Sequence, residues 1–183
     1  MNLPETGPLL DAGDLVLRPP LDADLPRLIE AFADAEVARI SAMSRFGEPP
    51  YGETHAIAWL DRQREARADG RRMILAIELD GGLAGTIDID FANAGQGRGE
   101  LGYWVTESFR GRGVARRAIR RVSDYAIGEL GLARIEILVE PHNEASCRAA
   151  AAAGYTREGL LRQFLEFEAQ RHDLIMYSLL PGE

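Results

Sequence analysis

Apolar residues recur along the chain with two different periods, and these periods separate strands from helices. Short runs rich in Leu, Val and Ile predict about seven strands, and segments with apolar residues at every third or fourth position predict about four helices. The predicted strands are 15–18, 72–79, 83–91, 101–105, 134–140, 155–167 and 171–180, and the predicted helices are 22–32, 54–68, 114–130 and 143–153. Asp22 is expected to cap the first helix. The order β-α-α-β-β-β-α-β-α-β-β predicts one mixed α/β domain over 1–183, with its core at about 15–180.

A short loop rich in glycine and arginine, Arg110–Ala115, joins a predicted strand to the predicted helix 114–130. The first N–H groups of a helix lack intrahelical partners, and the helix dipole adds about half a positive charge there. Phosphate is therefore a favourable ligand at such a point. Gly111 and Gly113 lack side chains that would keep phosphate oxygens away. The loop does not end in the Gly-Lys-Ser or Gly-Lys-Thr of a P-loop, and a tight connection without a ligand is the alternative.

Charge is unevenly distributed along the chain. The whole chain has a formal net charge of −8, whereas residues 110–121 contain six arginines and no acidic residue. These are Arg110, Arg112, Arg116, Arg117, Arg120 and Arg121. A domain that binds nucleic acid is usually basic as a whole, so we expect no nucleic-acid partner. The basic run favours contact with phosphate groups, with a solvated helix face as the alternative.

Several other classes of protein are disfavoured by composition. The single cysteine, Cys147, excludes an internal disulfide and a multi-cysteine metal site, and His55, His142 and His172 lack metal-ligand spacing. No apolar run approaches the roughly 20 residues of a membrane span, and the N-terminus lacks the pattern of a signal peptide. We therefore expect a cytoplasmic chain with no metal and no membrane partner.

Four segments, in this order, resemble the GCN5-related N-acetyltransferase (GNAT) family, in its Rim-type branch of ribosomal-protein N-terminal acetyltransferases. The segments are Glu100–Val105, Arg110–Ala115, Asn143–Ser146 and Ala153–Tyr155. The resemblance implies the single-domain GNAT fold, a mixed and mostly antiparallel sheet whose fourth and fifth predicted strands are splayed apart. It also implies acetyl-CoA as co-substrate, a primary amine as acceptor, and a role in cofactor binding for particular residues. These are Val105, Thr106, Arg110, Gly111, Arg112, Gly113, Val114, Ala115, Arg116, Arg117 and Asn143.

Each part of this set has its own implied role. The loop Arg110–Ala115 would bind the pyrophosphate of coenzyme A, and Arg116 and Arg117 its 3′-phosphate. Backbone groups of Val105 and Thr106 would pair with the pantetheine arm, and an N–H near Val105 would bond the thioester carbonyl. Asn143 would bind pantetheine or help hold the splayed strands, with a helix N-cap as an alternative or additional role.

The resemblance also implies two catalytic residues. Glu100 is the candidate base that removes a proton from the amine, directly or through a water, with a surface carboxylate as the alternative. Many GNAT enzymes have a tyrosine seven residues after the motif asparagine, where this chain has Ala150. Rim-type relatives have a serine three residues after it, here Ser146, to which protonation of the leaving thiolate is assigned. Cys147 is interpreted as a small buried residue.

The acceptor is less well defined than the donor. A protein N-terminal α-amine is the first choice that the Rim-type resemblance implies. A larger fraction of such an amine is neutral at pH 7 than of a lysine side chain. A small-molecule amine, with acetyl or succinyl transfer, is one alternative, and a non-catalytic acyl-CoA-binding module is another. The segment 41–54, broken by glycine and proline, is expected to form an irregular loop beside the acceptor. A homodimer stays open.

Overall fold

The chain divides into two compact units that interleave along the sequence. The computed structural model describes residues 7–43, 52–167 and 169–183. The first unit comprises Met1–Asp88 and Tyr103–Val114, and the second comprises Ile89–Gly102 and Ala115–Glu183. Three elements pass from one unit into the other along the chain, namely β4 (Gly82–Asp90), β5 (Arg98–Val105) and α4 (Val114–Gly128).

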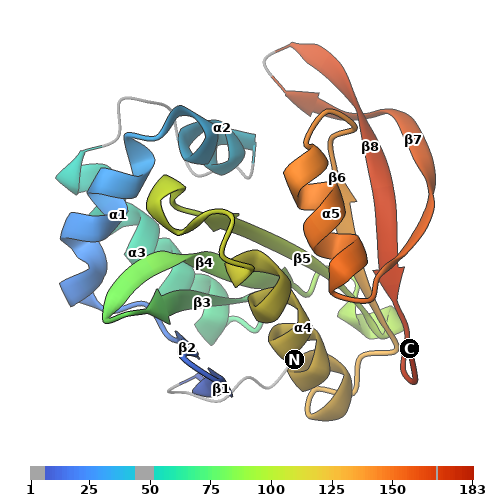
Figure 1. Ribbon diagram of the computed structural model, residues 1–183, viewed down its shortest axis with the longest axis horizontal. Helices are drawn as coiled ribbons and strands as arrows, with labels where there is room; N and C mark the ends of the chain where they lie inside the picture. Colours follow the sequence, from blue (N-terminus) through green and yellow to red (C-terminus); the bar gives the residue numbers. More distant parts are fainter. Residues whose placement is uncertain (1–6, 44–51, 168) are drawn as a thin grey trace. The chain divides into compact units, whose positions relative to one another are not determined.

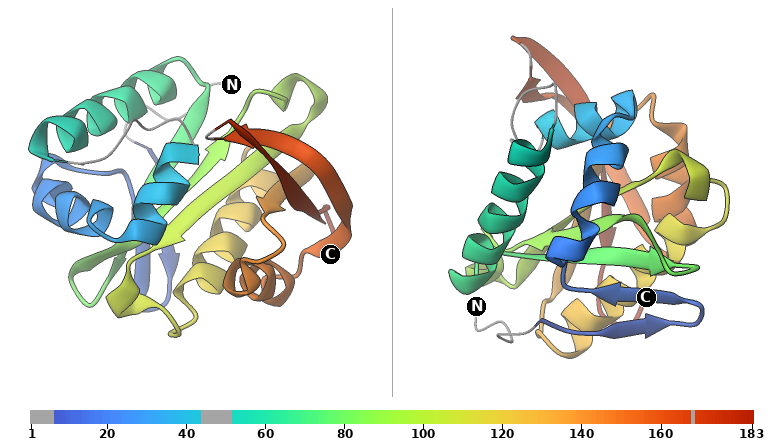
Figure 2. Two further views of the ribbon diagram at one scale, coloured as in Figure 1. Left: turned by 90° about the horizontal axis from the view of Figure 1, so that it is seen from above. Right: turned by 90° about the vertical axis from the view of Figure 1, so that its left-hand side faces the viewer.

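The first unit combines antiparallel strands with three helices. The strands β1 (Leu10–Ala12), β2 (Leu15–Arg18) and β3 (Arg72–Leu79) are antiparallel neighbours, and β4 follows β3 in the sheet. The helices are α1 (Leu25–Phe32), α2 (Ala35–Met43) and α3 (Glu53–Ala68), and α1 and α3 lie side by side in both views of Figure 2.

Aromatic side chains fill the core of the first unit. Phe32 of α1 lies with its ring centre 6.1 Å from that of Trp59 and 6.1 Å from that of Trp104. All three side chains are buried. Aromatic rings at such separations and at an angle to one another add attraction beyond the area they bury, so this group fixes α1 and α3 together with the end of β5.

The start of α1 differs from the expectation that Asp22 caps it. A short 3-10 turn, Asp22–Asp24, precedes the helix, and Asp24 Oδ2 accepts the Leu21 N–H at 2.8 Å. Asp22 instead accepts a hydrogen bond from Arg64 at 2.6 Å. Burial alone would raise the pKa of Asp24, but hydrogen bonds from Arg18 and the Leu21 N–H outweigh it and lower that pKa. Asp22 therefore does not cap α1. The carboxylate of Asp24 is held by Arg18 and by the Leu21 N–H.

The second unit has a long hairpin and a parallel strand pair. Here β5 is followed in the sheet by β6 (Arg134–Val139), β8 (Gln170–Leu179) and β7 (Thr156–Phe167). The β5–β6 pair is parallel, whereas β6–β8 and β8–β7 are antiparallel. Helix α5 (Glu144–Ala152) packs against β6 (Figure 1).

The described residues contain eight strands and five α-helices, one more of each than expected. The additional strand β1 has three residues, too few to show an alternating pattern. The additional helix α2 runs to Met43, so it includes the first residues of the segment 41–54 that was expected to be irregular. Residues 44–51 of that segment lie outside the described residues. The mixed, mostly antiparallel sheet of the expectation is confirmed.

Candidate active site

Two glycines shape the loop between β5 and α4. Gly111 has φ +75° and Gly113 has φ +72°, in the left-handed region where side chains are strained. A Cβ at either position would meet no heavy atom within 4 Å, so the space beside the loop is open. The loop therefore leaves the first N–H groups of α4 accessible to an anion.

Two arginines of this loop already hold protein partners. Arg110 donates from Nε to Val105 O at 3.0 Å and from Nη2 to Asp34 at 2.8 Å. Arg112 donates to Asp80 at 2.6 Å, and its guanidinium carbon lies 5.2 Å from the Phe109 ring centre. The Arg112–Asp80 pair is largely exposed, so a phosphate could replace the Asp80 carboxylate at little cost, whereas the Asp34 side chain is only 17% exposed.

Arg116 differs from the loop arginines. Its side chain is exposed on the first turn of α4, and no carboxylate in the described part of the chain pairs with it. The neighbouring Arg117 is half-buried and has contacts of its own. Arg116 is thus a cation at the start of α4 whose hydrogen bonds the described residues leave available.

The end of β5 directs one backbone donor away from β4. The Thr106 N–H and Oγ1 both donate to Ala84 O of β4, at 2.9 and 3.2 Å. Successive residues of an extended strand direct their N–H and C=O groups to opposite edges. The Val105 N–H therefore points to the other edge, as does the Val105 carbonyl that accepts Arg110 Nε. Of the two expected pantetheine contacts, Val105 offers its N–H, whereas the Thr106 N–H serves the sheet.

Pairing between β5 and β6 is short. The register covers Arg98–Glu100 with Arg134–Glu136, although β5 continues to Val105 and β6 to Val139. The described ladder thus ends after three pairs. Residues 103–105 of β5 belong to the first unit and β6 belongs to the second, so the expected splay of these two strands stays a prediction.

The side chain of Glu100 is exposed, whereas that of its register partner Glu136 is buried. Glu136 is 5% exposed, and it accepts hydrogen bonds from Arg98 at 3.0 Å and from Arg134 at 2.6 Å. Burial raises the pKa of Glu136, and the two arginines lower it by more. Because paired residues of parallel strands share a face, Glu100 and Glu136 lie on the same side of the sheet.

The start of α5 brings two sequence-predicted residues together. Asn143 Oδ1 accepts the Ser146 N–H at 3.0 Å, which is the N-cap interaction. Ser146 is half-buried, and Ala150 is fully buried one turn later. Cys147 is half-buried rather than buried, and its thiol lies near the Tyr177 hydroxyl. Burial and this neighbouring thiol raise the pKa of Tyr177.

Sequence reasoning missed a cluster that directly precedes this cap. Glu140 is 6% exposed, with Oε1 3.2 Å from His172 Nδ1 and Oε2 3.7 Å from His142 Nε2. Its backbone carbonyl accepts the Asn143 N–H at 2.9 Å. Only the pairing of β6 with β8 brings His172 to Glu140, so no local spacing signals it. The described residues include no group of three side chains arranged to hold a metal ion.

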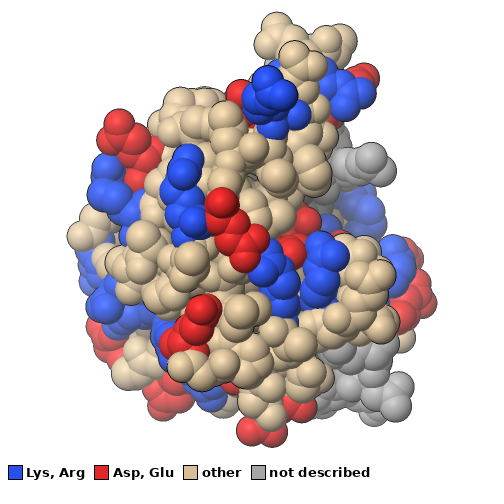
Figure 3. Space-filling model, turned by 90° about the vertical axis from the view of Figure 1, so that its right-hand side faces the viewer, with Lys and Arg blue, Asp and Glu red and all other residues tan. Residues whose placement is uncertain are grey.

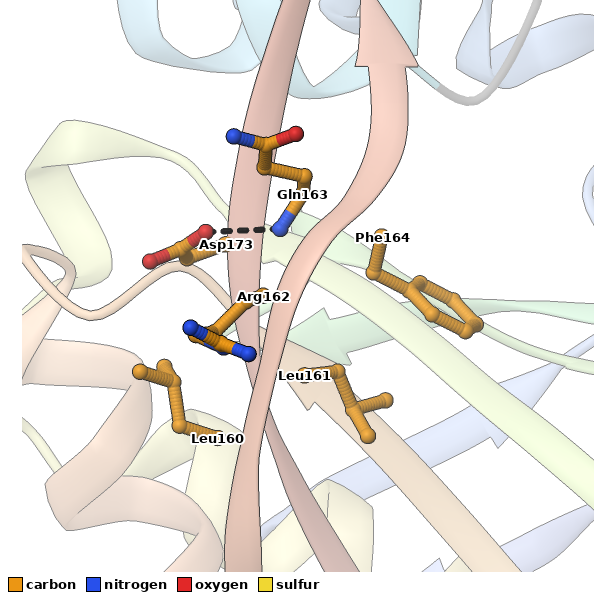
Figure 4. Close-up of a pocket in the computed structure, with 6 residues that line it drawn as sticks. All are labelled: Leu160, Leu161, Arg162, Gln163, Phe164 and Asp173. Atoms are coloured by element: carbon orange, nitrogen blue, oxygen red, sulfur yellow. Dashed lines mark hydrogen bonds between the residues drawn. The ribbon is translucent and has the colours of Figure 1, made fainter.

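A pocket on the β7–β8 hairpin contains none of the expected site residues. It is lined by Leu160, Leu161, Arg162, Gln163, Phe164 and Asp173 (Figure 4). The strands are out of register between Leu161 and Leu165, and Gln163 there has φ +51°, which is uncommon for a residue with a side chain. Asp173 accepts the Gln163 N–H at 2.7 Å, the dashed line in Figure 4, and so fixes this irregular turn.

Positive and negative side chains are interspersed on the face shown in Figure 3. This agrees with the many arginine–carboxylate pairs of the structure, such as those of Arg98 and Arg134.

No helix in the described ranges is long and apolar enough to cross a membrane.

Together these features define an α/β protein with a glycine-rich loop at the start of a helix, next to a strand whose edge offers a backbone donor. Residues 14–156 match the family model of the acetyltransferase (GNAT) domain, which is most of the chain. The chain belongs to this family, and it is a GNAT N-acetyltransferase.

Similar proteins include enzymes with different names. YdaF of Bacillus subtilis (strain 168), named as a candidate ribosomal N-acetyltransferase, is 32% identical over 165 residues, covering 87% of each chain. The spermidine N(1)-acetyltransferase of Escherichia coli (strain K12) is 26% identical over 125 residues, covering 68% of this chain and 66% of the relative. The structure of Mycobacterium smegmatis RimJ in complex with CoA-disulfide has a TM-score of 0.79 and 28% identity, covering 96% of this chain and 86% of that chain.

Proposed function

We propose that this protein transfers an acetyl group from acetyl-CoA to a primary amine, with the α-amine of a protein N-terminus as the first choice. The observation that carries the proposal is the loop with Gly111 and Gly113, which leaves the first N–H groups of α4 accessible. The coenzyme A in the RimJ structure and the ribosomal name of YdaF support the donor and the acceptor, respectively.

The chain offers a chemically suitable group for each part of acetyl-CoA. The N–H groups at Gly113, Val114 and Ala115 suit the pyrophosphate, assisted by Arg112 once it exchanges the exposed Asp80 carboxylate and by Arg110 once it leaves Asp34. Arg116 and Arg117 suit the 3′-phosphate. The Val105 N–H is directed to bond the thioester carbonyl and to stabilise the negative charge that develops on it. Asn143 would meet the pantetheine arm with its amide NH2, because only its oxygen caps α5.

The reaction needs an amine in its neutral form. At pH 7 an α-amine of pKa about 8 is roughly one-tenth neutral, while a lysine of pKa about 10.4 is neutral in roughly one molecule per 2,500. An N-terminal acceptor therefore asks less of the base. We assign proton removal to Glu100, directly or through a water, because its carboxylate is exposed on β5.

Protonation of the departing thiolate is assigned to Ser146. Ala150 has no proton to give and is fully buried, so the half-buried serine one turn earlier is the nearest hydroxyl of α5. We place this reaction in the cytoplasm, in line with the composition of the chain, and a cytoplasmic enzyme would meet newly made protein N-termini.

An acceptor screen tests the proposal. Free thiol is measured with acetyl-CoA or succinyl-CoA and three amines, namely a peptide with a free N-terminus, the same peptide N-acetylated but carrying a lysine, and spermidine. We expect thiol release with acetyl-CoA and the free N-terminus. Release with spermidine alone would assign a small-molecule acceptor, which the E. coli relative represents. Binding of acetyl-CoA without thiol release for any amine would indicate a non-catalytic module.

The Ser146→Ala variant tests the proposed acid. We expect kcat to fall about ten- to hundredfold with little change in the Kd of acetyl-CoA, because the hydroxyl acts on the leaving group and not on the bound thioester. Cys147→Ala is the matched control on the same helix and should keep kcat. Full kcat in Ser146→Ala would show that water protonates the thiolate, and loss in Cys147→Ala would point to an acyl-cysteine route.

A further inference from the structure

A buried carboxylate and a histidine are paired on the face of the second unit that carries Glu100. Side chains of an extended chain alternate, so Glu136 of β6 and Glu140, which directly follows β6, lie on one face, and Glu136 is in register with Glu100. His172 of β8 reaches the same face, since its Nδ1 lies 3.2 Å from Glu140 Oε1. Three strands thus contribute Glu100, Glu140 and His172 to one side of the sheet.

The Glu140–His172 pair is asymmetric. The Glu140 side chain is 6% exposed and the His172 side chain is 25% exposed. A carboxylate beside Nδ1 holds the imidazole in one orientation with its proton on Nδ1, which leaves Nε2 as a proton acceptor. In the part of the chain that the structure describes, His172 Nε2 has no hydrogen-bond partner.

Two hydrogen bonds connect this pair to the proposed acid. The Glu140 carbonyl accepts the Asn143 N–H at 2.9 Å, and Asn143 Oδ1 accepts the Ser146 N–H at 3.0 Å. The pair therefore lies at the same end of β6 as the residue assigned to the leaving thiolate. A base and an acid are thus held by one short segment, Glu140–Ser146, and the strand beside it.

We propose that His172, oriented by Glu140, is a second proton acceptor for the acceptor amine and works alongside Glu100. The inference rests on the proposed function. His172 Nε2 takes one proton from the ammonium group, and the freed electron pair of the nitrogen forms the C–N bond to the thioester carbonyl carbon. The C–S bond breaks with its electron pair on sulfur, and Ser146 gives its hydroxyl proton to the thiolate. The second amine proton replaces the proton on the Ser146 oxygen, and the imidazolium returns its proton to water.

Imidazole suits this step better than a carboxylate does. The unperturbed pKa is about 4.3 for a glutamate and about 6.5 for a histidine, against about 8 for an α-amine, and general bases are most efficient when their pKa lies near the working pH. The charged groups around His172 are Glu140, His142 and, on its own strand, Arg171 and Asp173. Arg171 is paired with Glu166, and Asp173 with the Gln163 N–H.

The test compares His172→Ala with His142→Ala, since both histidines adjoin Glu140 but His142 is 70% exposed. With a free peptide N-terminus, His172→Ala should lose at least about tenfold in kcat with the Kd of acetyl-CoA unchanged, and His142→Ala should stay within twofold. Added imidazole should restore part of the lost kcat in His172→Ala. The positioning variant Glu140→Gln should lose less and should not respond to imidazole.

A second acceptor separates catalysis from structure. The same peptide with a weakly basic aminooxy group in place of the α-amine is already neutral, so the loss in His172→Ala should shrink to under about twofold. Equal losses with both acceptors, unchanged kcat in His172→Ala, or an equal loss in His142→Ala would each overturn the inference. If His172→Ala does not fold, His172→Asn keeps a donor toward Glu140 and the same outcomes apply. Failure of the native protein with every amine would instead count against the proposed function.

Discussion

Two arginines of the second unit differ in how they are held. Arg134 donates from Nε to Glu136 at 2.6 Å and from both terminal nitrogens to Glu158 at 2.7 Å, and its side chain is 22% exposed. Arg116 is exposed at the start of α4 and pairs with no carboxylate within 7–43, 52–167 or 169–183. A guanidinium with satisfied hydrogen bonds stabilises the sheet, whereas one without them is available to a phosphate. The comparison teaches that counting positive charges does not locate an anion site.

The largest effect on acetyl-CoA affinity should follow from introducing a glutamate side chain into the loop before α4. Gly113→Glu should raise the Kd of acetyl-CoA at least about a hundredfold, or about 2.7 kcal/mol, because the carboxylate would occupy the phosphate site and repel its ligand. Isothermal titration calorimetry measures the change.

Gly131→Glu is the matched control for this variant. Gly131 has φ +70° against +72° for Gly113, and a Cβ at either position meets no atom within 4 Å. The backbone strain is therefore similar, but Gly131 follows the other end of α4. A folded Gly113→Glu protein with native affinity, or an equal loss in Gly131→Glu, would contradict the assignment of the loop.

The next effect concerns the satisfied arginine. Arg134→Met should lower the free energy of unfolding by about 2 to 3 kcal/mol, because Glu136, 7% exposed, would lose one of its two cations. Urea denaturation gives the value. Arg148→Met removes an exposed pair with Glu144 and should cost under about 0.5 kcal/mol. Comparable losses of stability in the two variants would contradict the distinction between an arginine with a buried partner and an arginine in an exposed pair.

A smaller effect is expected from the available arginine. Replacing Arg116 and Arg117 with Gln should weaken coenzyme A binding about tenfold, which is one or two charge-assisted hydrogen bonds at a solvated site. Binding of dephospho-coenzyme A, which lacks the 3′-phosphate, should hardly change. Arg120→Gln is the control, since Arg120 pairs with Asp124 on the same helix. An equal loss of affinity for coenzyme A and dephospho-coenzyme A would show that these arginines do not bind the 3′-phosphate.

Local signals in the sequence predicted most helices and strands. The contacts that the sequence did not predict depend on residues that are distant along the chain. The glycines of the loop and the cap by Asn143 depend on neighbours a few residues away, so the sequence was sufficient for them. The partners of Arg110 could not be predicted, because Asp34 lies 76 residues earlier. The Glu140–His172 contact likewise exists only because β8 returns beside β6.

The smallest effect tests the same arginine network by pH. Hydrogen bonds from Arg134 and Ser178 lower the pKa of Glu158 to about 2, from an ordinary value of 4.5. A carboxyl whose pKa is lower in the folded state stabilises the fold fully above its unfolded pKa. That contribution is lost as pH falls from about 4.5 to about 2. Because the Glu158 side chain is 41% exposed, solvent screening limits it to under about 1 kcal/mol.

The Glu158→Gln variant isolates this contribution from those of the other carboxylates. At pH 7 the variant should unfold at a slightly lower urea concentration than the native protein, because the amide binds Arg134 less strongly than a carboxylate does. At pH 2 to 2.5 the two midpoints should nearly converge, because the carboxyl is then protonated in the unfolded chain and only about a quarter or less of its contribution to stability remains. A gap that stays constant from pH 7 to pH 2.5 would mean that Glu158 contributes through packing. In that case only the ion pair of Arg134 with Glu136 would contribute electrostatic stabilisation.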